Sequence, residues 1–210
     1  MRHITFSVLF ATVAVANASF FDNFDSGASP LWGNEVGGWT AAGGLYDAQA
    51  PGNFPAAHSS LPWDVSEFEA EFDMVNGSAI DGGLWFHSAA APATAVGRTG
   101  YLLVLSGGHI YWHVVEDGSG YGSILAPQFN AYVGSPHVRV TSVAGVHSAY
   151  LNGSSDPVTT LTDSTFTHGR LALYDNHVQT RFDNFSTSVP EPGSLAILAA
   201  GALLAARRRR

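Results

Sequence analysis

Hydrophobic and polar residues alternate along the stretch from Glu67 to Asp73. Phe68, Ala70 and Phe72 are interleaved with four carboxylates, and this period of two predicts a β-strand with one apolar and one acidic face. Further short runs that are rich in β-branched and aromatic residues also predict strands. These runs cover residues 84–86, 101–105, 109–115, 138–143, 149–151, 171–174 and 181–185.

Turn-forming pairs of residues separate the predicted strands. The pairs are Asn76-Gly77, Gly82-Gly83, Gly107-Gly108, Asp117-Gly118 and Asn152-Gly153. Outside the two ends of the chain, no stretch has a helical pattern. Many short strands at regular spacing therefore predict an all-β fold, a sandwich of two antiparallel sheets.

The tetrapeptide Phe-Asp-Asn-Phe occurs twice, at residues 21–24 and 182–185, close to both ends of the predicted β-domain. Jelly-roll sandwiches commonly bring their first and last strands together in one sheet, and the repeat favours such an arrangement. We expect the phenylalanines to point into the core, and Asp22 and Asp183 to point outward or toward a shared ion. Since the chain has thirteen phenylalanines, a chance repeat is the alternative.

The N-terminal end has the organisation of a secretory signal peptide. A short basic region at residues 1–3 precedes a stretch that is almost entirely apolar. Ala16 and Ala18 then form a small-residue motif, which predicts cleavage by signal peptidase after Ala18. Residues 1–18 are therefore a predicted signal helix, and a first helix or strand of the fold is the alternative.

Charge excludes several classes of function for residues 19–188, the predicted single domain. Four arginines face sixteen acidic residues there, which gives a net charge of −12, and the chain has no lysine. Such a surface repels phosphate backbones, so nucleic acid is excluded as a partner. The chain also has no cysteine, which excludes thiol nucleophiles and cysteine-bound zinc, and the lack of lysine excludes Schiff-base chemistry.

The C-terminal segment, residues 189–210, is built from three parts. Its first part is the tripeptide Pro190, Glu191 and Pro192, the 15 residues between Glu191 and Arg207 carry no charge, and the chain closes on an arginine cluster. As a helix the uncharged stretch is about 22 Å long, and a bilayer core needs about 20 apolar residues. The stretch is therefore a little short, and it predicts a weak membrane anchor that Arg207, Arg208, Arg209 and Arg210 would orient from the cytoplasmic side.

These three parts, in this order, resemble the PEP-CTERM sorting signal of Gram-negative bacteria. The resemblance implies that an exosortase recognises the Pro-Glu-Pro box and cleaves near it. The protein would pass through the inner membrane transiently and reach the cell surface or the exopolysaccharide. A permanent tail anchor is the alternative.

Pieces of the predicted domain, taken in order, resemble a concanavalin A-like (laminin-G-like) jelly roll. They are Trp39 with residues 44–46, and then residues 68–72, 82–86, 101–112, 138–140, 149–153, 169–174 and 182–185. The resemblance implies two curved antiparallel sheets, with glycans often held on the concave face or in the loops. The family includes lectins, adhesion modules and glycoside hydrolases, so the fold alone does not select a function.

The acidic face of the first predicted strand offers candidate catalytic residues. Glu69, Glu71 and Asp73 would lie in a row, with neighbours about 7 Å apart along the strand. Retaining glycosidases need two carboxyl groups about 5 to 5.5 Å apart. Concanavalin-like glucanases carry an aspartate in the middle of this row, and this chain carries a glutamate there. A solvated strand face is therefore the main alternative.

Aspartates and aromatic residues supply the other candidates. Asp22, Asp25 and Asp183 would meet if the terminal strands pair, and their oxygens suit a structural calcium ion. Sugar rings stack on exposed aromatic faces. The candidate ligand-binding aromatics on predicted strands are Trp85, Tyr101, Tyr111 and Trp112.

The sequence thus predicts an exported surface protein with one concanavalin-like sandwich between two processing signals. We expect a non-catalytic role, in which the protein binds extracellular polysaccharide or helps to build the matrix. Two alternatives stay open at this point: a glycoside or keto-glycoside hydrolase of the same fold, and a purely structural matrix protein.

Overall fold

A computed structural model of the chain describes six ranges of residues. These are residues 18–52, 56–75, 80–88, 99–116, 120–176 and 179–189. Residues 1–17 of the predicted signal helix, including Ala16, lie outside them, whereas Ala18 begins a strand. The sorting residues Pro190, Glu191 and Pro192, the predicted C-terminal helix and the arginines at 207–210 also lie outside them. None of the described ranges contains a helix with the length and hydropathy that crossing a bilayer requires.

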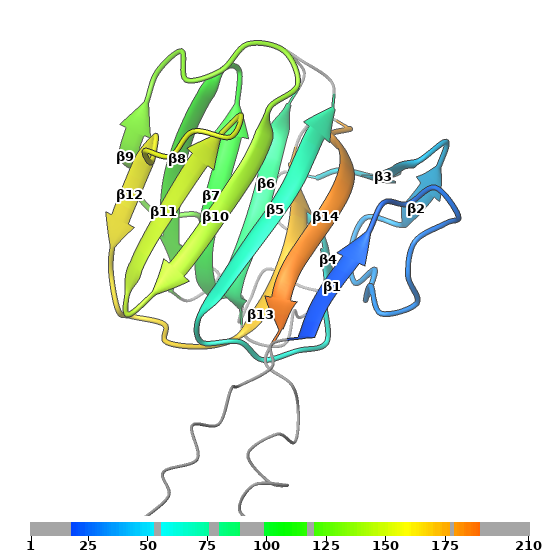
Figure 1. The fold of residues 1–210 in the computed structure, drawn as a ribbon, viewed down its shortest axis with the longest axis horizontal. Coiled ribbons are helices and arrows are strands. Elements are labelled where there is room, and N and C mark those ends of the chain that lie inside the picture. Colours follow the sequence, from blue (N-terminus) through cyan, green and yellow to red (C-terminus); the bar gives the residue numbers. More distant parts are fainter. Residues whose placement is uncertain are drawn as a thin grey trace, which may run out of the picture. The chain divides into compact units, whose positions relative to one another are not determined.

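Fourteen strands in the described ranges form two antiparallel sheets that lie face to face (Figure 1). Sheet I contains, in spatial order, β12 (Thr159–Thr162), β11 (Val146–Leu151), β10 (His137–Val143), β5 (Phe68–Val75), β14 (Arg181–Val189), β3 (Leu45–Ala48) and β2 (Trp39–Ala42), with β1 (Ala18–Asp22) also paired to β14. Sheet II contains β4 (Ala57–Ser60), β13 (Arg170–Asp175), β6 (Asp81–Ser88), β7 (Gly100–Ser106), β8 (His109–Val115) and β9 (Leu125–Gln128). The predicted two-sheet sandwich is confirmed, and Ser19–Val189 form one compact unit.

The main hydrophobic core fills the space between the sheets. β5 buries Phe68 and Phe72 on one face and turns its carboxylates to the other, as its alternating sequence predicts. The Phe68 ring meets the Phe86 ring of sheet II edge-on, with centroids 5.2 Å apart. Burial of one such ring contributes about 1.5–3 kcal/mol to folding.

The outer face of sheet II is also apolar and buried. Trp85, Leu102 and Tyr174 belong to a second hydrophobic cluster on this face, whereas their neighbours along the strands point into the main core. The strands β6 and β7 are therefore buried on both faces. This explains why residues 84–86 and 101–105 are continuous apolar runs rather than alternating ones.

The repeated tetrapeptide confirms one expectation and corrects another. β1 and β14 are neighbours in sheet I, as the repeat predicts. However, Phe21 is 61% exposed and Asp22 is buried. The chain turns inward directly after β1, so that the Asp22 carboxylate accepts hydrogen bonds from the backbone N–H groups of Phe24 and Ser29.

The glycine pair at residues 82 and 83 is not a turn, which corrects the sequence-based expectation. Both glycines lie inside β6, between β13 and β7. A Cβ on Gly82 would come within 2.4 Å of the Tyr174 carbonyl oxygen, and one on Gly83 within 2.2 Å of the Leu103 carbonyl oxygen. The pair therefore allows three backbones to approach closely. The predicted turns at 107–108 and 152–153 are confirmed.

Candidate functional site

The structure places three of the four candidate ligand-binding aromatics in the interior. Trp85, Tyr101 and Trp112 are at most 1% exposed, so no face of these rings is open to a sugar. The prediction of a stacking platform there is wrong, because both faces of sheet II are covered. Tyr111 is half-buried and packs against the second hydrophobic cluster.

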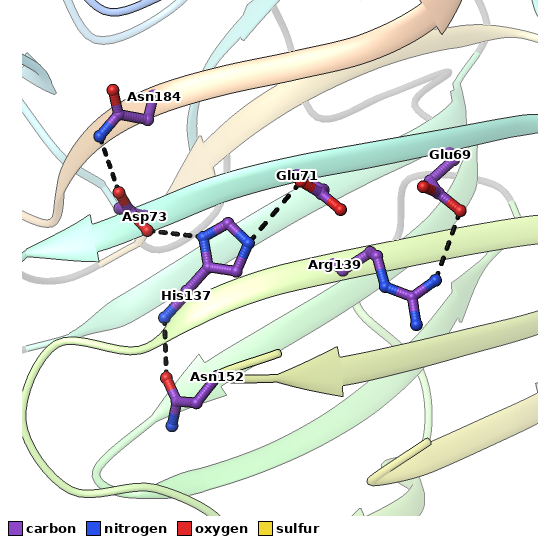
Figure 2. A network of polar contacts seen from close by, with 7 residues as sticks. All are labelled: Glu69, Glu71, Asp73, His137, Arg139, Asn152 and Asn184. Carbon is purple, nitrogen blue, oxygen red and sulfur yellow. Dashed lines mark hydrogen bonds and ion pairs between the residues drawn. The ribbon is translucent and has the colours of Figure 1, made fainter. Parts of the chain in front are cut away.

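The acidic row on β5 forms a network with the neighbouring strands (Figure 2). Glu69 accepts a hydrogen bond of 3.3 Å from Arg139 Nη1 on β10. Asp73 Oδ1 lies 2.7 Å from His137 Nδ1, while its Oδ2 accepts a 2.8 Å bond from the Asn184 amide. Glu71 Oε2 lies 3.8 Å from the other nitrogen of His137.

This network combines one ion pair, between Arg139 and Glu69, with polar contacts of His137 and Asn184, and its side chains are partly exposed. The Arg139 guanidinium is further occupied, since it stacks 3.8 Å above the Tyr150 ring. Glu69 and Glu71 also border a hollow of about 200 Å³. Its other lining residues are Ser19, Ser186, Thr187 and Ser188. Glu69 is paired with Arg139, while Glu71 and Asp73 share His137, so the row has the polar contacts expected of a solvated strand face.

The predicted calcium ligands are not assembled as a group. Besides its backbone contacts, Asp22 accepts a hydrogen bond from the Trp32 indole at 3.0 Å. Burial raises the pKa of Asp183, and the nearby carboxylates of Asp73 and Asp25 add to this effect. Across the described ranges, no group of three or more His, Cys, Asp or Glu side chains is placed to hold a metal ion. Calcium binding stays a prediction.

Two adjacent hollows lie where the loops between the sheets meet. The large hollow, about 490 Å³, is lined by Pro62, Asp64, His87, Ser88, Thr99, Phe166, His168, Gly169 and Arg170. The small hollow, about 220 Å³, is lined by Ser66, Glu67, His87, Ala144, Gly145, Ser164, Phe166 and Thr167. His87 and Phe166 line both, so the two hollows meet at these residues.

His87 connects two of the loops that form the hollows. Its Nδ1 lies 3.0 Å from the Phe166 carbonyl oxygen, and its Nε2 lies 3.1 Å from the Ser66 carbonyl oxygen. A neutral imidazole donates to one of these oxygens, and a protonated ring donates to both. Burial lowers the pKa of His87, and the two carbonyl contacts oppose that effect.

Tyr101 and Asp163 fix the loop that carries Phe166. The Tyr101 hydroxyl donates a 2.7 Å hydrogen bond to Asp163 Oδ1 and accepts one of 3.0 Å from the Phe166 backbone N–H. Burial raises the pKa of Tyr101 to about 12, so the hydroxyl keeps its proton at neutral pH. The Phe166 backbone is thus held at both its N–H and its carbonyl group.

Gly169 brings this loop against the end of β6. Its φ is +153°, and a Cβ there would lie 2.4 Å from the carbonyl carbon of His87. The backbone of Gly169 also exchanges hydrogen bonds with Val65, at 2.9 and 3.1 Å. A glycine is therefore required for the close approach that forms one side of the large hollow.

Charged side chains face the large hollow in a mixed set. His168 Nδ1 lies 3.0 Å from Asp64 Oδ1, and the two side chains are about two-thirds exposed, at 66% and 65%. Arg170 donates a 3.5 Å hydrogen bond to Ser60 Oγ and, within the described residues, makes no ion pair. Donors and acceptors therefore lie beside one another around a half-buried aromatic ring, that of Phe166.

Sequence reasoning missed the residues of both hollows except Glu67, which belongs to the alternating strand. Asp64 and His168 are 104 positions apart in the chain and lie in connecting segments without a motif. No local spacing signals that they meet. The site depends on β4, β6 and β13 lying side by side in sheet II.

Acid is expected to destabilise the loops behind the hollows through His147. The ring is fully buried, and burial together with the nearby His87 lowers its pKa to about 4. The unfolded chain therefore binds more protons than the native state between pH 6.5 and 4, so stability falls as the pH drops. We expect a loss of about 1–2 kcal/mol between pH 7 and 5 from this group.

Urea unfolding at a series of pH values measures this contribution. The variant His147→Gln keeps a donor for the Asp163 carbonyl oxygen and an acceptor for the Ser142 hydroxyl, the two partners of the ring. Its stability should vary less over the same pH range. The exposed His168→Ala is the control, and an equal flattening in both variants would contradict the assignment to His147.

Comparison with known proteins identifies the C-terminal segment. Residues 188–210 match the PEP-CTERM protein-sorting motif. This confirms the resemblance seen in the Pro-Glu-Pro box, and it implies export, transit through the membrane and processing by an exosortase. No curated protein matches the chain in sequence.

Solved structures share the fold of the sandwich. The carbohydrate binding module CBM66 from Bacillus subtilis matches with a TM-score of 0.63 and 18% identity, over 76% of this chain and 96% of that one. A native glycosidic hydrolase matches with a TM-score of 0.56 and 12% identity, over 86% and 99%. The GH43 protein BlXynB from Bacillus licheniformis also has a TM-score of 0.56 and 12% identity, over 81% of this chain and 39% of its own.

At these identities the likeness shows the fold alone. It confirms the expected jelly-roll-like sandwich, and it includes both a binding module and glycosidic enzymes. The chain therefore carries a PEP-CTERM sorting motif after a β-sandwich of the fold found in carbohydrate-binding and glycosidic proteins.

Proposed function

We propose that this chain is an exosortase-processed protein of the cell surface or exopolysaccharide, and that its sandwich binds a glycan without cleaving it. The sorting motif supports the destination. The proposed binding site is the large hollow, in place of the buried aromatics.

The observation that carries this proposal is the mixture of side chains around the large hollow. Asp64 offers acceptors, Arg170 offers donors, and the imidazole of His168 offers either. Phe166 adds a half-buried aromatic ring beside them. A few convergent polar groups around an aromatic side chain are typical of sites that bind small hydroxyl-rich ligands.

The arrangement of carboxylates favours binding over hydrolysis. Glycosidases use two carboxyl groups, about 5–5.5 Å apart in retaining and about 6.5–9.5 Å apart in inverting enzymes. Among the described lining residues, the two carboxylates lie in different hollows, Asp64 in the large one and Glu67 in the small one, with Phe166 and His87 shared between them. Asp64 is paired with His168, and Glu67 Oε1 accepts a 3.2 Å hydrogen bond from the backbone N–H of Ala144.

A binding experiment with the compact unit Ser19–Val189 tests the proposal. A glycan array that includes the exopolysaccharide of the host would identify a ligand, and calorimetry would give its affinity. The double variant Asp64→Ala/His168→Ala should bind at least about tenfold more weakly, which corresponds to about 1.4 kcal/mol. Both side chains are exposed, so the fold should be unaffected.

The matched control is Glu69→Ala, which breaks an exposed ion pair on sheet I instead. It should leave the affinity unchanged. Equal affinity of the wild type and the double variant would move the site elsewhere. No binding to any array glycan or to the host polymer would favour a structural matrix protein, and release of shorter sugars from a bound polymer would favour a hydrolase.

A further inference from the structure

We infer that the large and small hollows form one continuous site that holds several consecutive sugar units from within a polysaccharide chain. The ligand class is thus a polymer rather than a free monosaccharide or a chain end. This inference rests on the proposed glycan-binding function and specifies its ligand.

The two hollows are adjacent, because His87 and Phe166 line both of them. Small-molecule sites have volumes of about 300–1,000 Å³, and the large hollow alone, at about 490 Å³, falls within this range. The small hollow adds about 220 Å³ on the other side of the shared residues. A ligand that fills both must therefore cross Phe166.

Phe166 is suited to lie under the middle of such a ligand. The edge-to-face contact with Tyr101, with ring centroids 5.5 Å apart and planes at 73°, buries part of the ring and leaves the rest accessible. Its backbone is held on both sides by Tyr101 and His87. A rigid aromatic ring loses little entropy when a sugar packs on it.

Polar side chains continue on both sides of Phe166. The large hollow presents Asp64 and His168, and the small hollow presents Glu67 and Thr167. All four are exposed, so each hollow opens to solvent along its polar border. Hydrogen-bonding groups for hydroxyls are thus available on either side of the central ring, as an internal stretch of a chain requires.

The dependence of affinity on ligand length tests this inference. The polymer found in the binding experiment would be partially hydrolysed, and fragments of one to six sugar units would be titrated calorimetrically into Ser19–Val189. We expect the affinity to rise at least about tenfold from one unit to four and then to level off. Phe166→Ala should remove most of this rise, with a cooperative thermal melt showing that the variant is folded.

Glu67→Gln tests the contribution of the small hollow alone. The amide oxygen can still accept the hydrogen bond from the Ala144 N–H, so the backbone there should be unchanged. The variant should weaken only the longer fragments, whereas Asp64→Ala/His168→Ala should weaken all that bind. Glu69→Gln, on β5, is the control. A monosaccharide that binds as tightly as the longest fragment, or long fragments that are unaffected by Glu67→Gln, would overturn the continuous site while the glycan-binding proposal stands. Binding of neither fragments nor polymer would contradict the glycan-binding proposal itself.

Discussion

Replacing Trp112 with alanine is expected to lower the free energy of unfolding by about 3–5 kcal/mol, the range for removing a large aromatic side chain from a core. The ring is fully buried between the sheets and meets the Phe86 ring edge-on, with centroids 6.1 Å apart. Its indole N–H donates a 3.1 Å hydrogen bond to the Thr159 hydroxyl, which in turn donates to the Ala126 carbonyl oxygen. Urea unfolding followed by circular dichroism measures the loss.

Tyr111→Ala provides the control on the same strand. Tyr111 points to the other face of β8 and is half-buried, so its truncation should cost less than that of Trp112. Phe166→Ala should show the opposite behaviour, with weaker glycan binding and a smaller loss of stability. A Trp112→Ala protein that keeps its stability and loses glycan binding would restore the stacking role that the sequence predicts for this ring.

The sequence predicts sheet I better than sheet II, for a physical reason. Along β5 one face is buried and the other is solvated, so the alternation from Phe68 to Asp73 shows which side chains form the core. β7 is buried on both faces, and the run from Tyr101 to Leu105 has no alternation to read. A ring such as Trp85 therefore suggests an exposed platform as readily as a core position.

The candidate site is less predictable than the fold, because it forms from loops that are distant in the chain. Asp64 follows β4, Phe166 and His168 precede β13, and His87 lies near the end of β6. Pairing of these three strands in sheet II brings the residues together. Long-range strand pairing does not show in the local sequence pattern. The sequence therefore draws attention only to Glu67 among these residues, as one of the four carboxylates that alternate with apolar residues.

Replacing Asp175 with asparagine is expected to stabilise the protein by about 4 kcal/mol at pH 8. The carboxyl group is fully buried at the end of β13. Its Oδ2 accepts a 3.2 Å hydrogen bond from the Thr180 N–H, and its Oδ1 has no hydrogen-bond partner within the described residues. Burial, with a contribution from the nearby Asp81, raises the pKa of Asp175 to about 7. Asparagine removes the buried charge and keeps an acceptor for Thr180.

The sign of this effect depends on pH. The native state retains the proton on Asp175 up to about pH 7, whereas the unfolded chain loses it near pH 3.8. The stability that this carboxyl group contributes is therefore complete below pH 3.8 and is lost as the pH rises through 7. The gain from Asp175→Asn should accordingly be large at pH 8 and close to zero at pH 4, as measured by urea unfolding at both values. Asp156→Asn, on an exposed loop, is the matched control.

Asp175 and His147 act in opposite directions over nearly the same pH range. Stability rises with pH through His147, between about 4 and 6.5, and falls with pH through Asp175, between 3.8 and about 7. The two contributions partly cancel in the wild type, so Asp175→Asn should show a steeper rise of stability between pH 5 and 7 than the wild type does. The double variant Asp175→Asn/His147→Gln should be nearly flat. The opposite result would be a loss of stability in Asp175→Asn at pH 8. If a chelator also lowered the stability of the wild type, the carboxylate would hold a cation.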